Sequence, residues 1–309
     1  MGKVVVLGSL NEDLMIETER LPQVGETLMG KSINYFVGGK GANQAVAAAR
    51  ASGEVSMLGK VGNDTFGEKI MAHLRQEKIQ IEAIASEKNM FTGTALVFKL
   101  PNDNCITVIP GANDLTDTDY ITEVSEQITD GDILLAQLEI PIASVLAGLK
   151  IAKQAGVTTI LNPAPFNDGV LDLLPFCDVI TPNEGEFSSI CTLKEIAHYD
   201  LENQINLLEA EYNTRVIVTR GSEGVSLVEN SYLKTIPTIQ ANVLDTTGAG
   251  DTFSGVLAAL IANQVELTQA IRMSSVAATM ATEKIGAQTG MPVYDDLLAI
   301  YEELNDVIS

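Results

Sequence analysis

Short apolar runs alternate with longer amphipathic segments along most of the chain. The apolar runs predict strands over Lys3–Leu7, Val55–Val61, Ile133–Gln137, Thr158–Leu161, Val179–Thr181, Arg215–Thr219 and Gly224–Val228. Several of them are apolar at every position, as expected for strands that are buried on both faces. The segments between them predict helices over Ala42–Ser52, Gly67–Glu77, Pro141–Ala155, Leu201–Tyr212, Asp251–Ala262, Leu267–Lys284 and Tyr294–Val307. This alternation predicts an α/β fold with a mostly parallel central sheet flanked by helices.

Two stretches interrupt this rhythm. Met15–Phe36 contains proline and glycine but no helical period, and Thr94–Val108 has two β-prone pieces around the turn sequence Pro101-Asn102-Asp103-Asn104. The second stretch therefore reads as a hairpin. We expect the two stretches to pair into a small β-sheet, a lid formed by about residues 14–37 and 94–109 and inserted into a single α/β domain over residues 1–309. An edge extension with only a packing role is the alternative.

Composition and charge exclude several classes of protein. Hydrophobic residues make up 46% of the chain and charged residues 19%, which is typical of a globular protein. The 41 acidic and 19 basic residues give a net charge of −22, so nucleic acids and anionic membranes are not expected as partners. The three cysteines are widely spaced, which argues against a disulfide framework or a zinc site. The first apolar run is too short for a signal peptide, and no run is long enough to span a bilayer, so we expect a cytoplasmic protein.

The most informative motif is the glycine-rich run Asp245–Phe253. Gly248, Ala249 and Gly250 allow backbone N–H groups to converge, and the residues after them have helical spacing. The run is therefore predicted to begin a helix whose N-terminus binds an anion, such as a phosphoryl group in transfer. Asp251 lies at the same turn, where a carboxylate is expected either to take a proton from an attacking hydroxyl or only to cap the helix. The spacing alone does not decide between these two roles.

A second glycine-rich run, Gly38–Ala45, precedes an alanine-rich helix. Its three glycines permit close approach of the backbone to a ligand, and Asn43 offers a donor and an acceptor that match sugar hydroxyls. Such runs are common, so this motif by itself is weak evidence for a site.

Two pairs of polar residues follow predicted strands. Asn11 and Asp13 come after the first strand, where α/β sheets bind ligands, although an Asx turn is the alternative. Asn183 and Glu186 follow the strand that ends at Thr181. Their N-x-x-E spacing suits a hydrated Mg²⁺ or a phosphate, and helix capping is the alternative.

Taken together, these motifs resemble the ribokinase-like (PfkB) carbohydrate kinase family. Gly38–Ala45 is similar to the N-terminal signature of that family, and Asp245–Asp251 is similar to the C-terminal one. Between them, Gln137–Pro141, Asn162–Pro165 and Thr181–Glu184 also match the family's order. Five ordered matches, spread over nearly the whole chain, are far more specific than any one of them.

The resemblance implies the ribokinase-like fold and transfer of the γ-phosphoryl group of ATP to the O5 hydroxyl of D-ribose, giving ribose 5-phosphate. It implies that Asp251 is the base and that Gly248, Ala249 and Gly250 form the anion hole. It further implies a sugar site made by Asn11, Asp13, Gly39, Lys40, Gly41, Ala42, Asn43, Glu139 and Asp251. ATP contacts would come from Asn183, Thr219, Arg220, Gly221, Ser222, Glu223, Gly224, Gly250, Asp251 and Ser275.

Two metal ions and a dimer are also implied by the resemblance. Glu186 would hold Mg²⁺ through water, and an activating K⁺ would be bound by Asp245, Thr247, Ala281, Lys284, Gly286 and Gly290. Gly290 departs from the serine often found at this place, and Ser275 from a larger polar residue often found near adenine. The lid would form a homodimer contact. A kinase for deoxyribose, fructose or pseudouridine, or a catalytically silent sugar or nucleotide sensor on the same fold, is the alternative.

Overall fold

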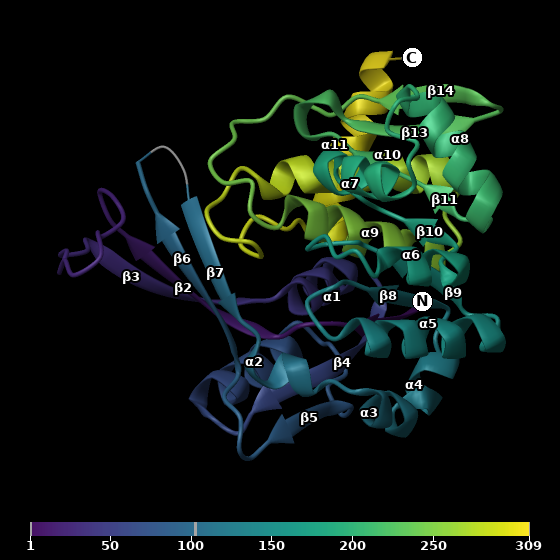
Figure 1. The fold of residues 1–309 in the computed structure, drawn as a ribbon. Helices are drawn as coiled ribbons and strands as arrows, with labels where there is room; N and C mark the ends of the chain where they lie inside the picture. The colour runs from purple at the N-terminus through teal and green to yellow at the C-terminus, as the bar shows by residue number, and fades with distance from the viewer. Residues whose placement is uncertain (1, 102–103, 309) are drawn as a thin grey trace.

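A parallel β-sheet lies at the centre of the molecule and has helices on both of its faces (Figure 1). The structure is a computed structural model that describes residues 2–101 and 104–308. The sheet has the strand order β11-β10-β9-β8-β1-β4-β5, and each neighbouring pair is parallel. Its strands are β1 (Lys3–Leu7), β4 (Glu54–Gly62), β5 (Ile84–Glu87), β8 (Ile133–Ala136), β9 (Thr158–Leu161), β10 (Val179–Ile180) and β11 (Arg215–Val216). The predicted fold class is therefore confirmed.

The helices cover the two faces of this sheet in two groups. One group comprises α1 (Lys40–Arg50), α2 (Thr65–Gln76), α9 (Ala249–Ala262), α10 (Leu267–Ala281) and α11 (Tyr294–Ile308). The other comprises α3 (Thr118–Glu123), α4 (Ser125–Thr129), α5 (Ile142–Ala155), α7 (Glu184–Leu193) and α8 (Leu201–Tyr212). The short helix α6 (Val170–Leu173) and 3₁₀ turns at Gly111–Leu115, Leu174–Phe176 and Gly221–Glu223 complete the helical elements. No helix in these described residues is both long and apolar enough to span a bilayer.

Each central strand contributes to both hydrophobic cores, because successive side chains point to opposite faces. In β1, Val4 and Val6 pack under α1 and α9, whereas Val5 and Leu7 pack under α5. All four side chains are fully buried. This double burial explains why the sequence of β1 is apolar throughout and does not alternate.

Most predicted elements are found close to their predicted bounds. The strands Lys3–Leu7 and Thr158–Leu161 and the helix Leu201–Tyr212 are confirmed to the residue. The single strand predicted over Arg215–Thr219 is wrong, because the chain crosses here from one sheet to another. β11 pairs with β10 in the central sheet, and β12 (Val218–Thr219) pairs with β13 (Val225–Glu229) in a separate sheet with β14 (Tyr232–Ile236).

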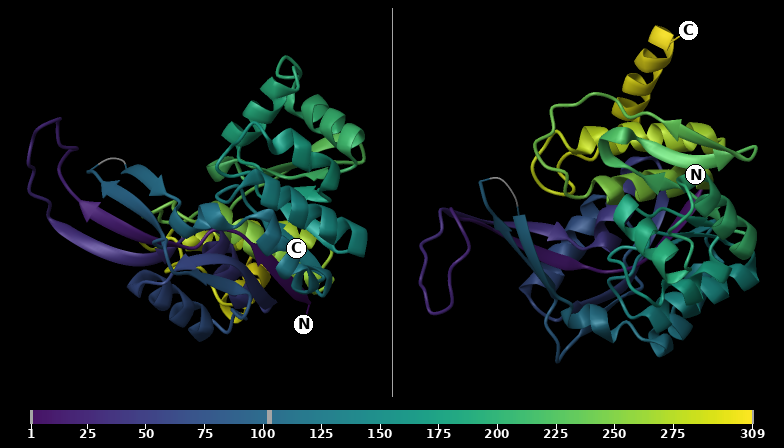
Figure 2. Two further views of the ribbon diagram at one scale, coloured as in Figure 1. Left: turned by 60° about the horizontal axis from the view of Figure 1, so that its bottom comes forward. Right: turned by 45° about the horizontal axis from the view of Figure 1, so that its top comes forward.

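The two irregular stretches do pair, and they form a four-stranded sheet that projects from the body (Figures 1 and 2). Its order is β3-β2-β6-β7, with β2 (Asn11–Glu17), β3 (Ser32–Gly38), β6 (Gly93–Lys99) and β7 (Asn104–Ile109). The contact between the stretches is the parallel pair β2–β6, and β2 follows β1 after only three residues. Residues 102–103 of the predicted turn lie outside the described residues. We call this sheet the lid sheet.

Small residues bring helices α1 and α9 into close contact. A β-carbon placed on Gly255 of α9 would lie 2.4 Å from the Gln44 carbonyl oxygen and 2.7 Å from the Ala47 side chain. Only glycine therefore fits where the two backbones meet. The N-termini of both helices lie toward the same edge of the central sheet, and this packing fixes their separation.

Candidate active site

The predicted sugar-site residues meet at the carboxyl-terminal edge of the central sheet. Asn11 and Asp13 lie on β2, which continues from β1, and Glu139 lies just after β8. Lys40 and Asn43 lie in the first turns of α1. The Asx-turn alternative for Asn11 and Asp13 is wrong, because both residues are in a paired strand. Ligands of α/β sheets bind at this edge, so the position suits a substrate site.

Asp251 is the third residue of α9, and its carboxylate is almost fully buried at 7% exposure. Its Oδ2 accepts a hydrogen bond from Asn43 Nδ2 and its Oδ1 accepts one from Gln44 Nε2, both at 2.9 Å. The helix cap is Gly248, in a left-handed conformation with φ of 80°, so the capping alternative for Asp251 is wrong. The carboxylate is instead held in one orientation by amides of the neighbouring helix.

Each of these two amides is oriented by a further amide. Gln137 Nε2 donates to Gln44 Oε1 at 2.7 Å, and Gln288 Nε2 donates to Asn43 Oδ1 at 2.9 Å. The sequence reasoning missed Gln44, Gln137 and Gln288 as parts of the site. Gln44 and Gln137 lie within two of the family motifs, Gly38–Ala45 and Gln137–Pro141, and this position is the one sequence signal that they are part of the site. For Gln288 the sequence offers only its nearness to Gly286 and Gly290.

The carboxylates of Asp13, Glu139 and Glu186 and the ammonium group of Lys40 interact electrostatically around Asp251. Burial raises the pKa of Asp13 to about 7, and the negative charges of Glu139, Glu12 and Asp251 add to that effect. Asp251 raises the pKa of Lys40, which therefore stays cationic. An anionic Asp13 is poorly solvated here, so hydroxyl donors of a ligand would stabilise it strongly.

Glu139 is held by groups from two other segments. Its Oε2 accepts hydrogen bonds from Ser9 Oγ at 2.5 Å and from the Lys40 backbone N–H at 3.1 Å. Gly39 precedes this amide with φ of 85°, and a β-carbon there would lie 2.8 Å from the Asn11 nitrogen. The glycine-rich run is thus required for the backbone to pass this close to β2.

Asn11 is buried beside a residue that the sequence reasoning also missed. Asn113 Nδ2 donates to Asn11 Oδ1 at 2.7 Å, and Asn113 Oδ1 accepts from the Leu10 N–H at 2.9 Å. A β-carbon on Gly93 would lie 2.2–2.3 Å from both amides. Asn113 therefore fixes the orientation of Asn11 at the start of the lid sheet.

The first turn of α9 presents backbone N–H groups beside Asp251. Thr252 is the first residue whose N–H bonds back along the helix, to the Gly248 carbonyl at 2.8 Å. The Ala249 N–H donates to the Thr246 carbonyl at 3.2 Å within the turn itself. Gly250 is exposed, and a β-carbon placed there would meet open space. Such a helix start attracts an anion through unpaired N–H groups and the helix dipole.

Two parts of the predicted ATP site, Asn183 and the Thr219–Gly224 turn, lie beside each other at the start of α7. Asn183 and Glu186 form a capping box: Asn183 Oδ1 accepts from the Glu186 N–H at 2.9 Å, and Glu186 Oε2 accepts from the Asn183 N–H at 2.8 Å. The capping alternative is therefore confirmed for this pair. Asn183 also bridges to Thr219, which begins the turn Thr219–Gly224. Ser275 is buried on α10.

The predicted cation ligands lie in two adjoining loops, apart from Ala281, which is the last residue of α10. Asp245 accepts hydrogen bonds from the N–H groups of Thr247 at 3.0 Å and Gly286 at 2.9 Å. Burial alone would raise the pKa of Asp245, but these hydrogen bonds outweigh it and lower the pKa. A β-carbon on Gly290 would lie 2.2 Å from the Ala281 carbonyl oxygen, so serine does not fit this backbone. Across residues 2–101 and 104–308, no cluster of three or more His, Cys, Asp or Glu side chains forms a metal centre.

Comparisons with known proteins agree with this geometry. The family model described as pfkB family carbohydrate kinase matches residues 1–293. The ribokinase of Lactococcus lactis subsp. lactis is 39% identical over 305 residues, which cover 98% of each chain. The ribokinase structure from Thermotoga maritima superposes with a TM-score of 0.89 at 28% identity, covering 98% of this chain and 100% of that one. The Arabidopsis thaliana ribokinase, solved with ribose and ATP, has a TM-score of 0.86 at 30% identity and coverage of 97% and 99%.

Proposed function

Because the chain belongs to the pfkB family of carbohydrate kinases, we propose that it transfers the γ-phosphoryl group of ATP to the O5 hydroxyl of D-ribose, giving ribose 5-phosphate and ADP. The observation that carries the proposal is the buried Asp251 carboxylate, fixed by two amides beside the exposed first turn of α9. A base and an anion-binding helix start lie side by side there. Phosphoryl transfer to a hydroxyl needs both groups.

The sugar would occupy the space bounded by Asn11, Asp13, Glu139 and the first turn of α1, with backbone contacts at Gly39, Gly41 and Ala42. Asp13 and Glu139 accept hydrogen bonds from sugar hydroxyls, and Lys40 balances their charge. Asn11 comes from the lid sheet and Glu139 from the body. Positioning of the sugar against the phosphate supplies most of the rate, because misplacement by about 1 Å costs roughly 10²-fold.

Asp251 would act as the general base. Both of its oxygens accept amide hydrogen bonds, which hold the carboxylate in one orientation near Lys40. The carboxylate takes the O5 proton as that oxygen bonds to the γ-phosphorus and the bond from phosphorus to the ADP oxygen breaks. The N–H groups of Gly248, Ala249 and Gly250 stabilise charge on the transferred group, for which Ala249 would release its turn contact with Thr246.

ATP would bind across Asn183, the Thr219–Gly224 turn and Ser275, with its γ-phosphate at Gly250 and Asp251. Glu186 suits a hydrated Mg²⁺, which binds through one or two carboxylates and the substrate phosphates. Burial raises the pKa of Glu186, while the positive charge of Lys40 opposes that rise. Mg²⁺, when bound, neutralises charge on the phosphates. Asn183 and Glu186 would then combine a capping role with ligand binding.

An activating K⁺ would bind between the two loops joined by Asp245. Asp245 stays ionised, and backbone oxygens of Thr247, Ala281, Lys284, Gly286 and Gly290 supply the remaining neutral ligands that suit K⁺. Asp245 already links Thr247 to Gly286, and Gly290 packs against the Ala281 carbonyl. The ion's contribution is to hold the loop that precedes α9.

The lid sheet would also form a homodimer. Strand registers place Leu14, Ile16, Ile33, Tyr35, Leu96 and Phe98 on the face opposite Asp13. Ile33 and Tyr35 are 47% and 50% exposed. An apolar face of this kind is typical of an interface between chains. The cysteines are free thiols, which suits a reducing compartment, so we also propose the cytoplasm.

The experiment that tests the function is an ADP-release assay with a panel of pentoses, hexoses and nucleosides, followed by ³¹P NMR of the product. D-Ribose is expected to give the highest kcat/KM and a 5-phosphate. Preference for deoxyribose, fructose or pseudouridine would replace the proposed acceptor within the same family. Binding of sugar and ATP without ADP release would indicate the silent sensor.

A further inference from the structure

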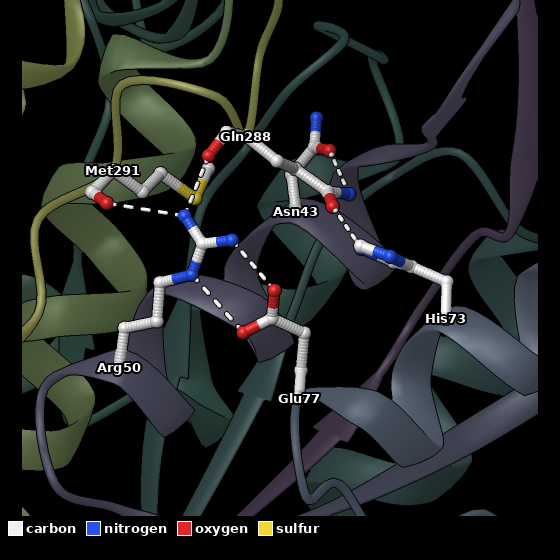
Figure 3. Close-up of polar contacts among 6 residues, drawn as sticks. All are labelled: Asn43, Arg50, His73, Glu77, Gln288 and Met291. Carbon is white, nitrogen blue, oxygen red and sulfur yellow. Dashed lines mark hydrogen bonds and ion pairs between the residues drawn. The ribbon is translucent and has the colours of Figure 1, made fainter.

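A chain of side-chain hydrogen bonds leads from Asp251 to His73, which lines a cavity. Figure 3 shows its part from Asn43 through Gln288 to His73. Asn43 donates to Asp251, Gln288 donates to Asn43 at 2.9 Å, and His73 Nε2 lies 2.7 Å from Gln288 Oε1. Gln288 is 8% exposed and Asn43 5%. The chain joins four elements: α9, α1, the loop between α10 and α11, and α2.

The carboxylate fixes the direction of every bond in this chain. Asp251, when ionised, can only accept, so Asn43 must present its NH₂ group to it. The Asn43 carbonyl oxygen then faces Gln288, which must present its own NH₂ group. The Gln288 oxygen therefore faces His73, whose Nε2 must carry a proton. Reversal of any amide would place two acceptors against each other.

Gln288 is itself held rigidly. Arg50 Nη1 donates to the Gln288 backbone oxygen at 2.7 Å and to the Met291 backbone oxygen at 3.1 Å (Figure 3). Arg50 is fixed in turn by a bidentate pair with Glu77, at 2.6 and 3.0 Å. Asn43 and Arg50 lie on the same helix, so α1 contacts the loop at both ends. The loop cannot shift without breaking charge-assisted bonds, which are the stronger class.

We propose that Gln288 is a positioning residue for the phosphoryl transfer, which holds the Asn43 amide with its NH₂ group toward Asp251. Gln288 does not touch the reacting atoms and acts only through Asn43. Without it, the Asn43 carbonyl oxygen loses its donor and the amide is held only by Asp251, so the position of one of the two donors that orient the carboxylate is less well fixed. This inference rests on the proposed function for its catalytic consequence, but the amide orientation is independent of it.

The test is the nearly isosteric substitution Gln288→Glu. It keeps an acceptor for His73 but replaces the donor to Asn43 by an acceptor, so the Asn43 amide lies between two acceptors and cannot bond well to both, whichever way it points. We expect kcat to fall about 10- to 100-fold, as for loss of one hydrogen bond to a charged group, with KM for ATP within about two-fold of wild type. Lys40, Asp13, Glu139 and Glu186 are the charged groups around Asp251, and the substitution leaves them in place but adds a carboxylate next to Asn43.

A double-mutant cycle separates this role from a merely structural one. In an Asn43→Ala background, Gln288→Glu is expected to change kcat by less than about two-fold. An equal loss in both backgrounds overturns the proposal. Gln76→Glu is the matched control, because Gln76 lines the same cavity but is exposed and lies outside the chain. If the glutamate variant is too unstable to assay, Gln288→Ala replaces it. Its loss of kcat is expected to be smaller, and in the Asn43→Ala background this loss must again be absent.

The Asn43 amide is also read without substrate, as the side-chain NH₂ signals that are missing from the Asn43→Ala spectrum. A change of these signals in Gln288→Glu but not in Gln76→Glu supports the inference whichever sugar is the substrate. Unchanged signals overturn it. Wild-type protein that transfers no phosphate to any acceptor would instead count against the proposed function, so the two failures are distinguishable.

Discussion

Replacement of Asp13 by Asn is expected to stabilise the folded protein above neutral pH and to weaken sugar binding. Burial, with the charges of Glu139, Glu12 and Asp251, raises the pKa of Asp13 from 3.8 to about 7. Between these two values the folded protein retains a proton that the unfolded chain has lost. Stability therefore falls as the pH rises from about 4 to about 7, and the whole cost of ionising Asp13 is present above pH 7. Asn has nearly the same shape and no charge, so the variant avoids this cost.

The size of the effect follows from the shift. A rise of about 3 pKa units corresponds to about 4 kcal/mol, taken as an upper bound. Unfolding entropy of about 2.1 cal/mol/K per residue gives roughly 0.65 kcal/mol/K for a chain of this length. The variant should therefore melt up to about 6 °C higher than wild type at pH 8 and at nearly the same temperature at pH 4.5.

Thermal melts at the two pH values, with ribose kinetics at pH 8, test this reasoning. Asp168→Asn is the control, because Asp168 is exposed in a loop. The melting temperature of this variant should differ little from that of wild type, and by the same amount at both pH values. KM for ribose should rise at least 10-fold in Asp13→Asn, since a hydrogen bond to a charged group is worth about 1.5–3 kcal/mol. A variant that melts no higher than wild type at pH 8 would refute the claim that Asp13 is a strained buried anion.

Three further outcomes are expected. Asp251→Asn should lower kcat by about 10²- to 10⁴-fold, or 3–5 kcal/mol, with little change in ATP affinity; near-normal turnover would remove the base assignment. Exchange of Na⁺ for K⁺ at constant ionic strength should raise the wild-type rate but not that of Asp245→Ala, and equal responses would exclude the cation site. Tyr35→Glu should convert the dimer to a monomer in light-scattering measurements, whereas a wild-type monomer or a dimeric variant would exclude this face as the interface.

The sequence predicted the fold well, because its signals are local and repeated. Buried parallel strands such as Lys3–Leu7 are apolar throughout, and helices such as Leu201–Tyr212 carry a clear period. The interruption at Ile217, between strands β11 and β12, has no such signal in the sequence. The chain changes sheets there without a turn, so residues 215–219 have the composition of one strand and the pairing of two. Only the positions of the partner strands decide between these readings.

The candidate site was predicted less completely, since much of it depends on contacts between distant segments. The glycine-rich runs identified Asp251 and Asn43 by type and position. The residues that orient them, Gln137 and Gln288, lie 93 residues from Gln44 and 245 residues from Asn43, respectively. An isolated glutamine has many ordinary roles, so nothing in its immediate neighbourhood marks it. The two readings of Asn183 and Glu186 are compatible, since capping and ligand binding use the same groups.

The contact of Gly255 with α1 has a consequence for how this protein tolerates change. The distance between α1 and α9 is set by residues that never meet a substrate, yet it determines whether Asn43 and Gln44 reach Asp251. A single methyl group at Gly255 would wedge the helices apart and lengthen both amide contacts. The alignment of the catalytic groups thus depends on close packing in the interior. A substitution at Gly255 is expected to slow the reaction even where the protein remains folded.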